Sequence, residues 1–337
     1  MTPPTIGVLG AGVIGSSVAH AAAAAGYTVT LVDSDPAALD TARRTVRRHQ
    51  RLATLLGGAS APALDIRPAT DLAALADVGF VVENTTESEP AKRALYPELE
   101  KVLAPGTTIA ANTSAVPIGR LAEGLTDPGR VVGVHFMNPV DRIDMVEVVR
   151  GEDTSDAALR DVDLMLQRLG KKAVVVRDAP GFVINRVLMP VVNLAAAVVA
   201  DGVATPSQVD DLFKGCLGHT SGPLRTADLI GIDTVVRTLE VLHEHYGTDE
   251  FVTHPALRRM VDQGRGGGRG GRGGGGGARA RAQRGAQTHP PPPPPVPHPS
   301  HTSGPPSHTP PRGPPRPLDQ GRLGAKSGRG FYSYDGN

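Results

Sequence analysis

The feature that most constrains this chain is the segment Gly10-Ala-Gly-Val-Ile-Gly15 near its start. An apolar run at residues 5–9 precedes it and predicts a short buried strand, and the Ala-rich residues 16–25 that follow predict a helix. A second apolar run at residues 29–32 ends in Asp33. A strand, a glycine-rich turn, a helix and a second strand within about 30 residues form a β-α-β unit.

The spacing of the glycines in this turn has a physical reason. Gly10 allows a tight turn, Gly12 lets the backbone approach a pyrophosphate, and Gly15 permits close packing of the helix on the strand. The helix N-terminus at Val13 and Ile14 then faces the phosphates with its dipole and its free N–H groups. The turn therefore predicts a dinucleotide site. A glycine-rich turn of another α/β fold is the alternative.

Asp33 indicates which dinucleotide binds. Its carboxylate can accept hydrogen bonds from the hydroxyls of an adenosine ribose, and its charge would repel a 2′-phosphate. Asp35 adds negative charge nearby, and no arginine directly follows Asp33. These residues predict NAD rather than NADP as the cofactor.

Apolar strand patterns alternate with helical patterns as far as about residue 178. Such alternation predicts a parallel sheet with helices on both faces. Beyond residue 178 the strand patterns nearly vanish. The predicted fold is α/β, with a Rossmann-type doubly wound sheet at residues 1–178 and a mostly α-helical domain at residues 179–337. The further strands expected are residues 80–82, 108–111, 131–134 and 173–176, and the further helices are 41–56, 89–103, 156–169, 185–200, 208–217 and 233–246.

Charge and composition exclude several classes of protein. The net charge of +1 and pI of about 8.0 give no field that favours nucleic acid or an anionic membrane. Cys216 is the single cysteine, so no intrachain disulfide is possible, and we expect it to be a small core residue. The start of the chain lacks a basic region, and no apolar stretch is long enough to span a bilayer. We expect a cytoplasmic protein without a metal site or a nucleic-acid or membrane partner.

Residues 266–317 interrupt the second domain. They are first Gly/Arg-rich and then Pro/His-rich, with six consecutive prolines at Pro290–Pro295, and this composition predicts disorder. The sequence Asp-Gln-Gly-Arg occurs before the tract at residues 262–265 and after it at 319–322, which indicates insertion into a finished domain. A genuine insertion, a repeat expansion and an error in the reported sequence stay open. An RNA-binding Arg-Gly segment is the functional alternative, which the lack of aromatic residues disfavours.

Polar side chains gather where the later apolar strands end. Ligands of open α/β sheets bind beyond the carboxyl ends of the strands, so these side chains predict a binding site there. A histidine in that place, with a carboxylate to orient it, suits a general base. The candidate residues are Asn112, Ser114, His135, Glu147 and Asn185.

Taken together, the chain resembles the 3-hydroxyacyl-CoA dehydrogenase family over nearly all residues outside the tract at 266–317. The spacing from Ser114 through His135 and Glu147 to Asn185 also agrees with the family. The matching segments are Gly10–Gly15, Val82-Glu83 with Glu87, Asn112–Ser114, Gly133–Pro139, Val146–Val148, Pro180–Arg186, Gly222–Leu224 and Lys326–Tyr332.

The resemblance implies a role for each candidate residue. His135 takes the proton of a 3-hydroxyl while hydride leaves C3 for NAD, and Glu147 orients His135 and stabilises its imidazolium. Ser114 and Asn185 hydrogen-bond the reacting oxygen. Plain structural readings remain: a hydrogen-bonded histidine, an ion-pair carboxylate, a helix N-cap at Ser114 and a structural amide at Asn185.

The resemblance also implies the surroundings of the cofactor. Glu87 and Lys92 match family positions that line the cofactor cleft, and Asn112 lies with them, although Lys92 could instead be a solvated helix charge. The helical domain would close the substrate side of the site and carry the contact of a homodimer.

Two departures from the family bear on the substrate. The segment between Asp33 and Phe80 is shorter than the helical hairpin that often clamps CoA, and Asp141 and Asp144 replace the usual Pro and Lys. Acidic residues near a substrate mouth do not favour the phosphates of CoA. A related branch of the family resembles this chain better, and it oxidises a hydroxyacyl group on an acyl carrier protein, such as a glyceryl thioester on the way to a methoxymalonyl extender unit for polyketides.

Further segments support that branch. Residues 83–87 and 224–228 are similar to it, and the basic helix expected at residues 41–56 suits an acidic carrier protein. A solvated helix face is the alternative for the basic helix, and 3-hydroxybutyryl-CoA or another 3-hydroxyacyl-CoA is the alternative substrate. The basic residues of the helix are Arg43, Arg44, Arg47, Arg48 and Arg51.

Two other classes of protein are alternatives. A β-hydroxyacid dehydrogenase similar to 6-phosphogluconate dehydrogenase tends to carry a catalytic lysine on its first interdomain helix, but here no lysine follows Asn185 before Lys214. A non-catalytic NAD-binding protein, disabled by the inserted tract, is the third class.

Overall fold

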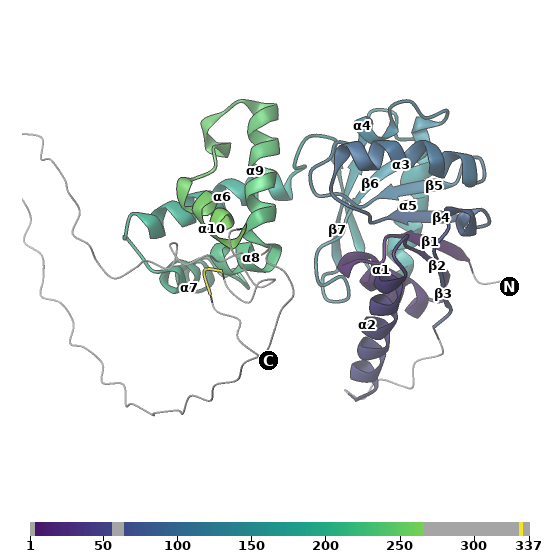
Figure 1. Cartoon of the computed structure of the whole chain (residues 1–337), viewed down its shortest axis with the longest axis horizontal. Coiled ribbons are helices and arrows are strands. Elements are labelled where there is room, and N and C mark those ends of the chain that lie inside the picture. Colours follow the sequence, from purple (N-terminus) through teal and green to yellow (C-terminus); the bar gives the residue numbers. More distant parts are fainter. Residues whose placement is uncertain (1–3, 56–63, 266–329, 333–337) are drawn as a thin grey trace, which may run out of the picture.

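The computed structural model describes residues 4–55, 64–265 and 330–332 and arranges them in two lobes (Figure 1). One lobe is a sheet flanked by helices, and the other consists of helices. The predicted Rossmann-type sheet followed by a helical domain is therefore confirmed. The tract at residues 266–317, for which disorder is predicted, lies outside the described residues.

Eight strands form one sheet in the order β3-β2-β1-β4-β5-β6-β7-β8. Neighbouring strands run parallel except for β6 and β7, which are antiparallel. The prediction of a parallel sheet is wrong at this pair, because the loop Phe136–Asp144 is shorter than the dozen or more residues that a parallel crossover needs. The strands are β1 (Thr5–Leu9), β2 (Thr28–Val32), β3 (Ile66–Ala69), β4 (Phe80–Glu83), β5 (Thr108–Ala111), β6 (Val131–His135), β7 (Met145–Arg150) and β8 (Lys172–Arg177).

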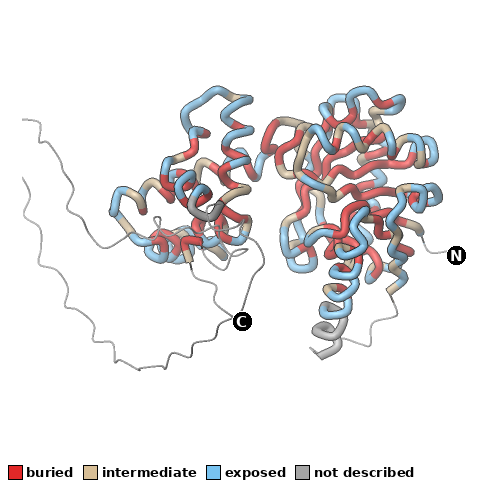
Figure 2. The backbone as a smooth tube through the Cα atoms, viewed as in Figure 1, coloured by how far each residue is buried: buried red, intermediate tan, exposed pale blue. Residues whose placement is uncertain are grey.

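Helices cover both faces of the sheet, so buried residues run along its strands (Figure 2). Successive strand residues point to opposite faces, and Val81 and Val82 accordingly belong to different apolar clusters. This double burial explains why the strands are nearly continuous apolar runs. One face is covered by α1 (Val13–Ala24), α2 (Pro36–Leu55) and α5 (Asp156–Arg168), and the other by α3 (Glu89–Val102) and α4 (Ile118–Ala122) together with the 3-10 helix η1 (Leu72–Leu75).

The helical lobe has its own apolar core, which also contains Phe331 from the end of the chain. Helix α7 begins with a capping box between Thr205 and Gln208 and ends at Gly218, whose φ of 72° suits glycine. Cys216 is exposed, so the prediction that it is a core residue is wrong. The elements of this lobe are α6 (Ile184–Ala200), α7 (Pro206–Leu217), α8 (Pro223–Ile230), α9 (Ile232–Tyr246), η3 (Asp249–Phe251) and α10 (Pro255–Arg265); η2 (Pro128–Arg130) precedes β6 in the sheet lobe.

The lobes are joined by the segment between β8 and α6. Gly181 and Phe182 both have positive φ, at 74° and 49°, and they turn the chain into α6. The Phe182 side chain is buried in the sheet lobe, while the Tyr246 hydroxyl of α9 donates to the Pro180 carbonyl at 3.1 Å. The junction is thus held from both lobes. Across the described ranges, no helix is both long and apolar enough to cross a membrane.

Candidate active site

The glycine turn lies at the carboxyl end of β1. Gly10 has a φ of 95°, and a Cβ atom there would lie 2.6 Å from the Asn84 carbonyl oxygen. A Cβ on Gly15 would collide with the Gly10 carbonyl, so this glycine is needed for α1 to pack so close to the turn. A Cβ on Gly12 would meet no atom within 4 Å, because Gly12 faces open space at the start of α1. The turn therefore leaves room for a pyrophosphate above the helix N-terminus.

Asp33 at the end of β2 braces this turn. Its Oδ2 accepts the Ala11 N–H at 2.7 Å and its Oδ1 accepts the Asp35 N–H at 2.9 Å. The half-buried carboxylate also lines a cavity of about 600 Å³, together with Gly12 and Thr85. Its oxygens have further lone pairs for ribose hydroxyls. The residues present thus fit NAD.

A buried ionic network lies beneath the end of β4. Both oxygens of Glu83 accept from the Lys92 ammonium at 2.7 and 2.8 Å, and both side chains are fully buried. Tyr96 donates to Glu83 at 3.1 Å, and Thr85 donates to it through its N–H and its hydroxyl. Burial, followed by the charge of Glu83, raises the pKa of Tyr96 well above its usual value, which keeps the phenol protonated.

Lys92 does not lie where the sequence places it. Its side chain has no exposed surface, so it lies behind the cofactor cleft and supports it through Glu83 and a 3.4 Å contact with the Asn112 carbonyl. The prediction that Lys92 lines the cleft is corrected on this point. The alternative of a solvated helix charge is also wrong. The physical reason is that a buried ammonium needs a carboxylate, and Glu83 supplies it.

Glu87 and Asn112 fix the loops that follow β4 and β5. One oxygen of Glu87 accepts from the Thr113 hydroxyl and the Ser114 N–H, both at 2.6 Å. The Asn112 amide donates to the Asn84 side chain at 2.8 Å and accepts the Phe136 N–H at 3.2 Å. The ends of three neighbouring strands are thereby tied together around the cofactor side of the site.

His135 and Glu147 are brought together by the antiparallel pairing of β6 and β7. They are register partners, and Nδ1 of His135 lies 3.0 Å from Oε2 of Glu147. Glu147 lies inside β7, not at a strand end as its neighbours on other strands do. The imidazole is almost fully buried, and its ring packs edge-on against Phe182 with ring centroids 6.0 Å apart.

The other oxygen of Glu147 reaches the helical lobe. It accepts the N–H of Val183 at 2.7 Å and of Ile184 at 3.3 Å, at the start of α6. Burial raises the pKa of Glu147, but the hydrogen bonds from His135 and from the backbone of Val183 outweigh it. The pKa therefore lies below its usual value, and Glu147 is an anion beside the imidazole.

Asn185 and Ser114 also meet across the two lobes. The Asn185 amide donates to the backbone carbonyl of Ser114 at 2.7 Å, and Asn185 directly follows Ile184, whose N–H Glu147 accepts. Ser114 is not a helix N-cap, because α4 starts at Ile118 and is preceded by Pro117 without a capping side chain. The N-cap alternative for Ser114 is therefore wrong.

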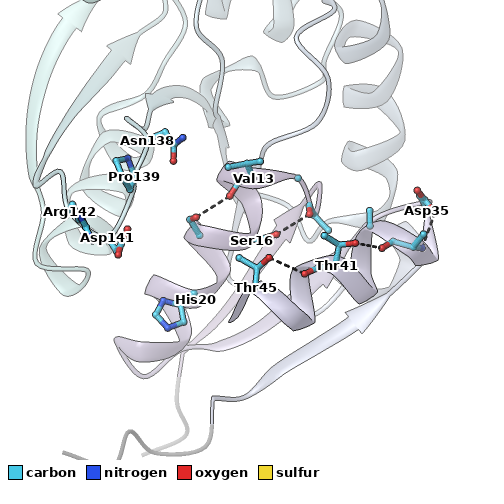
Figure 3. A pocket seen from close by; sticks show the side chains of 15 residues that line it. Val13, Ser16, His20, Asp35, Thr41, Thr45, Asn138, Pro139, Asp141 and Arg142 are labelled. Atoms are coloured by element: carbon cyan, nitrogen blue, oxygen red, sulfur yellow. Dashed lines mark hydrogen bonds between the residues drawn. The ribbon is translucent and has the colours of Figure 1, made fainter. Parts of the chain in front are cut away.

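A larger cavity of about 950 Å³ opens on the other side of the glycine turn (Figure 3). It lies between α1, α2 and the loop Phe136–Asp144, and sequence reasoning missed its helix residues. Their signal was the four-residue spacing that puts side chains on one face of a helix. Facing residues in Figure 3 are Ser16, His20, Thr41 and Thr45 on the helices, and Asn138, Asp141 and Arg142 on the loop.

The loop of this cavity is held by Lys171, a residue that the sequence did not single out. The lysine is buried, and its ammonium donates to the backbone carbonyls of Val140 and Ile143, the second at 2.9 Å. The ammonium of Lys171 therefore holds the loop in place by binding two of its backbone carbonyls. The side chains of Asp141 and Arg142 stay free to face the cavity.

The fold and the site together define an NAD-dependent dehydrogenase: a doubly wound sheet with a glycine turn, an acid after β2 and a histidine–carboxylate pair at the carboxyl end of β6. Residues 5–179 match the family model described as 3-hydroxyacyl-CoA dehydrogenase, NAD binding domain, and residues 181–275 match that of the C-terminal domain. The chain belongs to the 3-hydroxyacyl-CoA dehydrogenase family, whose members are NAD-dependent enzymes that act on a CH–OH group.

Individual relatives agree with this assignment. A probable 3-hydroxybutyryl-CoA dehydrogenase of Deinococcus radiodurans is 38% identical over 263 residues, which cover 77% of this chain and 94% of the relative. The 3-hydroxybutyryl-CoA dehydrogenase of Bradyrhizobium diazoefficiens is 36% identical over 264 residues, covering 77% and 90%. The crystal structure of (S)-3-hydroxybutyryl-CoA dehydrogenase from Ralstonia eutropha aligns with a TM-score of 0.76 at 29% identity, over 99% of this chain and 100% of that chain.

Proposed function

We propose that the enzyme oxidises the 3-hydroxyl of a hydroxyacyl thioester and that His135 is the general base that takes the hydroxyl proton. The observation that carries this proposal is the His135–Glu147 pair at the carboxyl end of β6. Nδ1 is committed to Glu147, which leaves Nε2 as the nitrogen that can take a proton from the substrate. Glu147 fixes the ring and stabilises the imidazolium that forms.

The remaining candidate residues position the reacting groups. The substrate O–H bond breaks towards His135, while the C3–H bond breaks with its electron pair and a C3=O double bond forms. Bound NAD supplies the acceptor of that hydride. Ser114 and Asn185 hold the substrate oxygen beside His135, and their mutual hydrogen bond keeps both in place. Asp33 binds the hydroxyls of the adenosine ribose, and the glycine turn, which Asp33 braces, binds the pyrophosphate.

The appearance of NADH with a panel of 3-hydroxyacyl thioesters tests this assignment. The wild-type enzyme should turn over at least one of them, and His135→Ala should turn it over at least about 100-fold more slowly. Turnover by His135→Ala at the wild-type rate would contradict the role of His135. Absence of turnover in the folded wild-type chain with every thioester would instead support a non-catalytic NAD-binding protein.

We propose further that the thioester is carried by an acyl carrier protein. The lining of the 950 Å³ cavity contains Asp35 and Asp141 but only one arginine, Arg142, so it offers little positive charge for the phosphates of CoA. Positive charge lies outside the cavity, on the exposed face of α2. Arg44 and Arg48 follow the cavity residues Thr41 and Thr45 by three residues each, and Arg44 contacts the Thr41 hydroxyl at 2.9 Å.

This arrangement suits a phosphopantetheine arm in the cavity with an acidic protein against α2. A rim of charge of this kind steers association more than it adds affinity. A glyceryl group that leads to a methoxymalonyl extender unit is the acyl group we favour. The alternative is 3-hydroxybutyryl-CoA or another 3-hydroxyacyl-CoA, which the relatives from Deinococcus radiodurans and Bradyrhizobium diazoefficiens favour.

The same hydroxyacyl group, presented on CoA and on a holo acyl carrier protein, separates the two carriers. We expect kcat/KM to be at least about tenfold higher with the carrier-protein substrate than with the CoA substrate. The double variant Arg44→Glu, Arg48→Glu should lower kcat/KM for the carrier-protein substrate and leave that for the CoA substrate unchanged. Arg160→Glu, an exposed arginine on α5, is the matched control for charge. Faster turnover on CoA would contradict the carrier proposal and leave the dehydrogenase assignment intact.

We also propose that the enzyme is a homodimer through its helical lobe. Val187, Leu194 and Val198 of α6 are exposed at helical spacing, with Leu212 and Leu217 of α7 also exposed. An apolar surface of this kind is typical of an interface. Sedimentation should give a dimer, and Leu194→Glu should shift it towards monomer. A monomeric wild-type chain at micromolar concentration would contradict the proposal.

A further inference from the structure

The segment Gly330–Tyr332, drawn in yellow in Figure 1, docks on α8 of the helical lobe. The two oxygens of Asp228 accept the consecutive N–H groups of Phe331 and Tyr332, each at 2.8 Å. Asp228 is fully buried. A buried carboxylate that binds two adjacent backbone N–H groups makes charge-assisted hydrogen bonds, which are stronger than neutral ones.

A second buried carboxylate, Asp210 of α7, recognises the side chain of Tyr332. The phenol donates to Oδ2 of Asp210 at 2.6 Å, and burial together with this bond raises its pKa, so the phenol stays protonated. Asp210 also accepts the N–H groups of Leu224 and Arg225 at the start of α8, both at 2.9 Å. The same carboxylate therefore caps the N-terminus of α8 and binds the hydroxyl of Tyr332.

The contacts also select the other two residues of the segment. A Cβ on Gly330 would collide with the Asp228 carboxylate, so only glycine fits there. Phe331 is 4% exposed and packs in the core with Leu224 and Ala227. The surface around Asp210 and Asp228 thus recognises the sequence Gly-Phe-Tyr by backbone, ring and hydroxyl at once.

We propose that this surface, the Asp210–Asp228 site, is a peptide-binding site whose ligand is the chain's own Gly-Phe-Tyr segment. The site binds the same peptide when it is supplied as a separate molecule. This inference does not rest on the proposed catalytic function, because none of its residues belongs to the NAD or thioester site.

Residues 266–329 of the sequence separate α10 from the segment. The chain's own segment and a separate peptide of the same sequence therefore compete for the same site.

The test uses the full chain and a fluorescent peptide of residues 328–334, Gly-Arg-Gly-Phe-Tyr-Ser-Tyr, followed by anisotropy. Gly330→Val disables the tethered ligand without changing the site, and Gly336→Val is the control for the same change elsewhere in the tail. The peptide should bind the Gly330→Val protein saturably, and at least tenfold more weakly to the wild type and to Gly336→Val, where the tethered segment competes.

Further variants identify the contacts. Adding Asp228→Asn to Gly330→Val should abolish peptide binding, and so should replacing Phe331 by alanine in the peptide. If Gly330→Val does not fold, as judged by circular dichroism, Tyr332→Phe replaces it. This variant loses the hydrogen bond to Asp210, which weakens binding of the chain's own segment, and it keeps both backbone bonds to Asp228. No saturable binding to a folded tail variant, or equal binding to variant and wild type, would overturn the proposal.

Discussion

Two buried glutamates at the carboxyl edge of the sheet, Glu83 on the cofactor side and Glu147 on the substrate side, invite comparison. Glu83 accepts one backbone N–H group and Glu147 accepts two, and each binds one cationic or potentially cationic side chain. The partner of Glu83 is Lys92, whose ammonium group is fully enclosed. The partner of Glu147 is His135, whose proton can leave.

The difference shows how one arrangement serves two purposes. A carboxylate that faces a fixed ammonium holds loops in position, here those that carry Thr85 and Asn112. A carboxylate that faces an imidazole holds a base whose charge changes during the reaction. The predictions below distinguish the Glu83–Lys92 pair from the Glu147–His135 pair.

The largest expected effect is on turnover by His135→Ala. General acid–base catalysis contributes about 10²–10⁴-fold, so kcat should fall within that range while NAD still binds. Steady-state kinetics and a separate titration of NAD check both parts. A variant with normal kcat would end the distinction between the two glutamates.

Lys92→Met should have the next largest effect, on stability. It leaves Glu83 buried without its cation, and breaking a buried ion pair in this way costs about 3–5 kcal/mol of unfolding free energy. Urea denaturation followed by circular dichroism measures the loss. Glu83→Gln combined with Lys92→Met should recover much of it, and a double variant no more stable than Lys92→Met would show that the pair is not the cause.

Glu147→Gln should act on turnover more than on the fold. A hydrogen bond to a charged group is worth about 1.5–3 kcal/mol, which corresponds to a loss in kcat of roughly tenfold to a hundredfold. The Michaelis constant for NAD should barely change, because Glu147 lies away from the glycine turn. An equal rise in that constant would place Glu147 with the cofactor machinery.

Glu147→Gln should also make the unfolding free energy depend less on pH in the acid range. The pKa of Glu147 is lower in the folded protein than its ordinary value of 4.5, so the unfolded chain takes up the proton first. The stability that ionised Glu147 contributes is complete above about pH 4.5 and is lost as the pH falls through the folded pKa. Unfolding free energies of wild type and Glu147→Gln should therefore converge towards low pH, and parallel curves would contradict this.

Tyr96→Phe should have the smallest effect. It removes one of several hydrogen bonds to Glu83 and leaves Lys92 and Thr85 in place, so about 1 kcal/mol of unfolding free energy should be lost. Urea denaturation under the conditions used for Lys92→Met gives the comparison. A loss as large as that of Lys92→Met would mean that the phenol, not the ammonium, balances the buried carboxylate.

Local patterns made the cofactor half of the site predictable. Gly10, Gly15 and Asp33 act within one β-α-β unit, so spacing in the sequence carries their geometry. The strand β3 escaped prediction because it has four residues, contains Pro68 and lies half-exposed at the sheet edge.

The substrate half was only partly predictable. The polar side chains beside the apolar strands and the family resemblance both indicated His135 and Glu147. Their contact depends on antiparallel register across the loop Phe136–Asp144, which composition does not encode. The burial of Lys92 and the hold of Lys171 on that loop depend on partners distant in sequence. Long-range pairing of polar side chains leaves no periodic trace in a single sequence.

The carboxylate of Glu147 also has a mechanical consequence. One oxygen belongs to the base in the sheet lobe and the other is bound by the first N–H groups of α6 in the helical lobe. Any swing of the helical lobe away from the sheet would strip those donors from the carboxylate and pull the Asn185 amide from Ser114. With fewer donors, the Glu147 carboxylate would attract the proton of the His135 imidazole more strongly. The hydrogen bonds of this single carboxylate thus depend on contacts from both lobes.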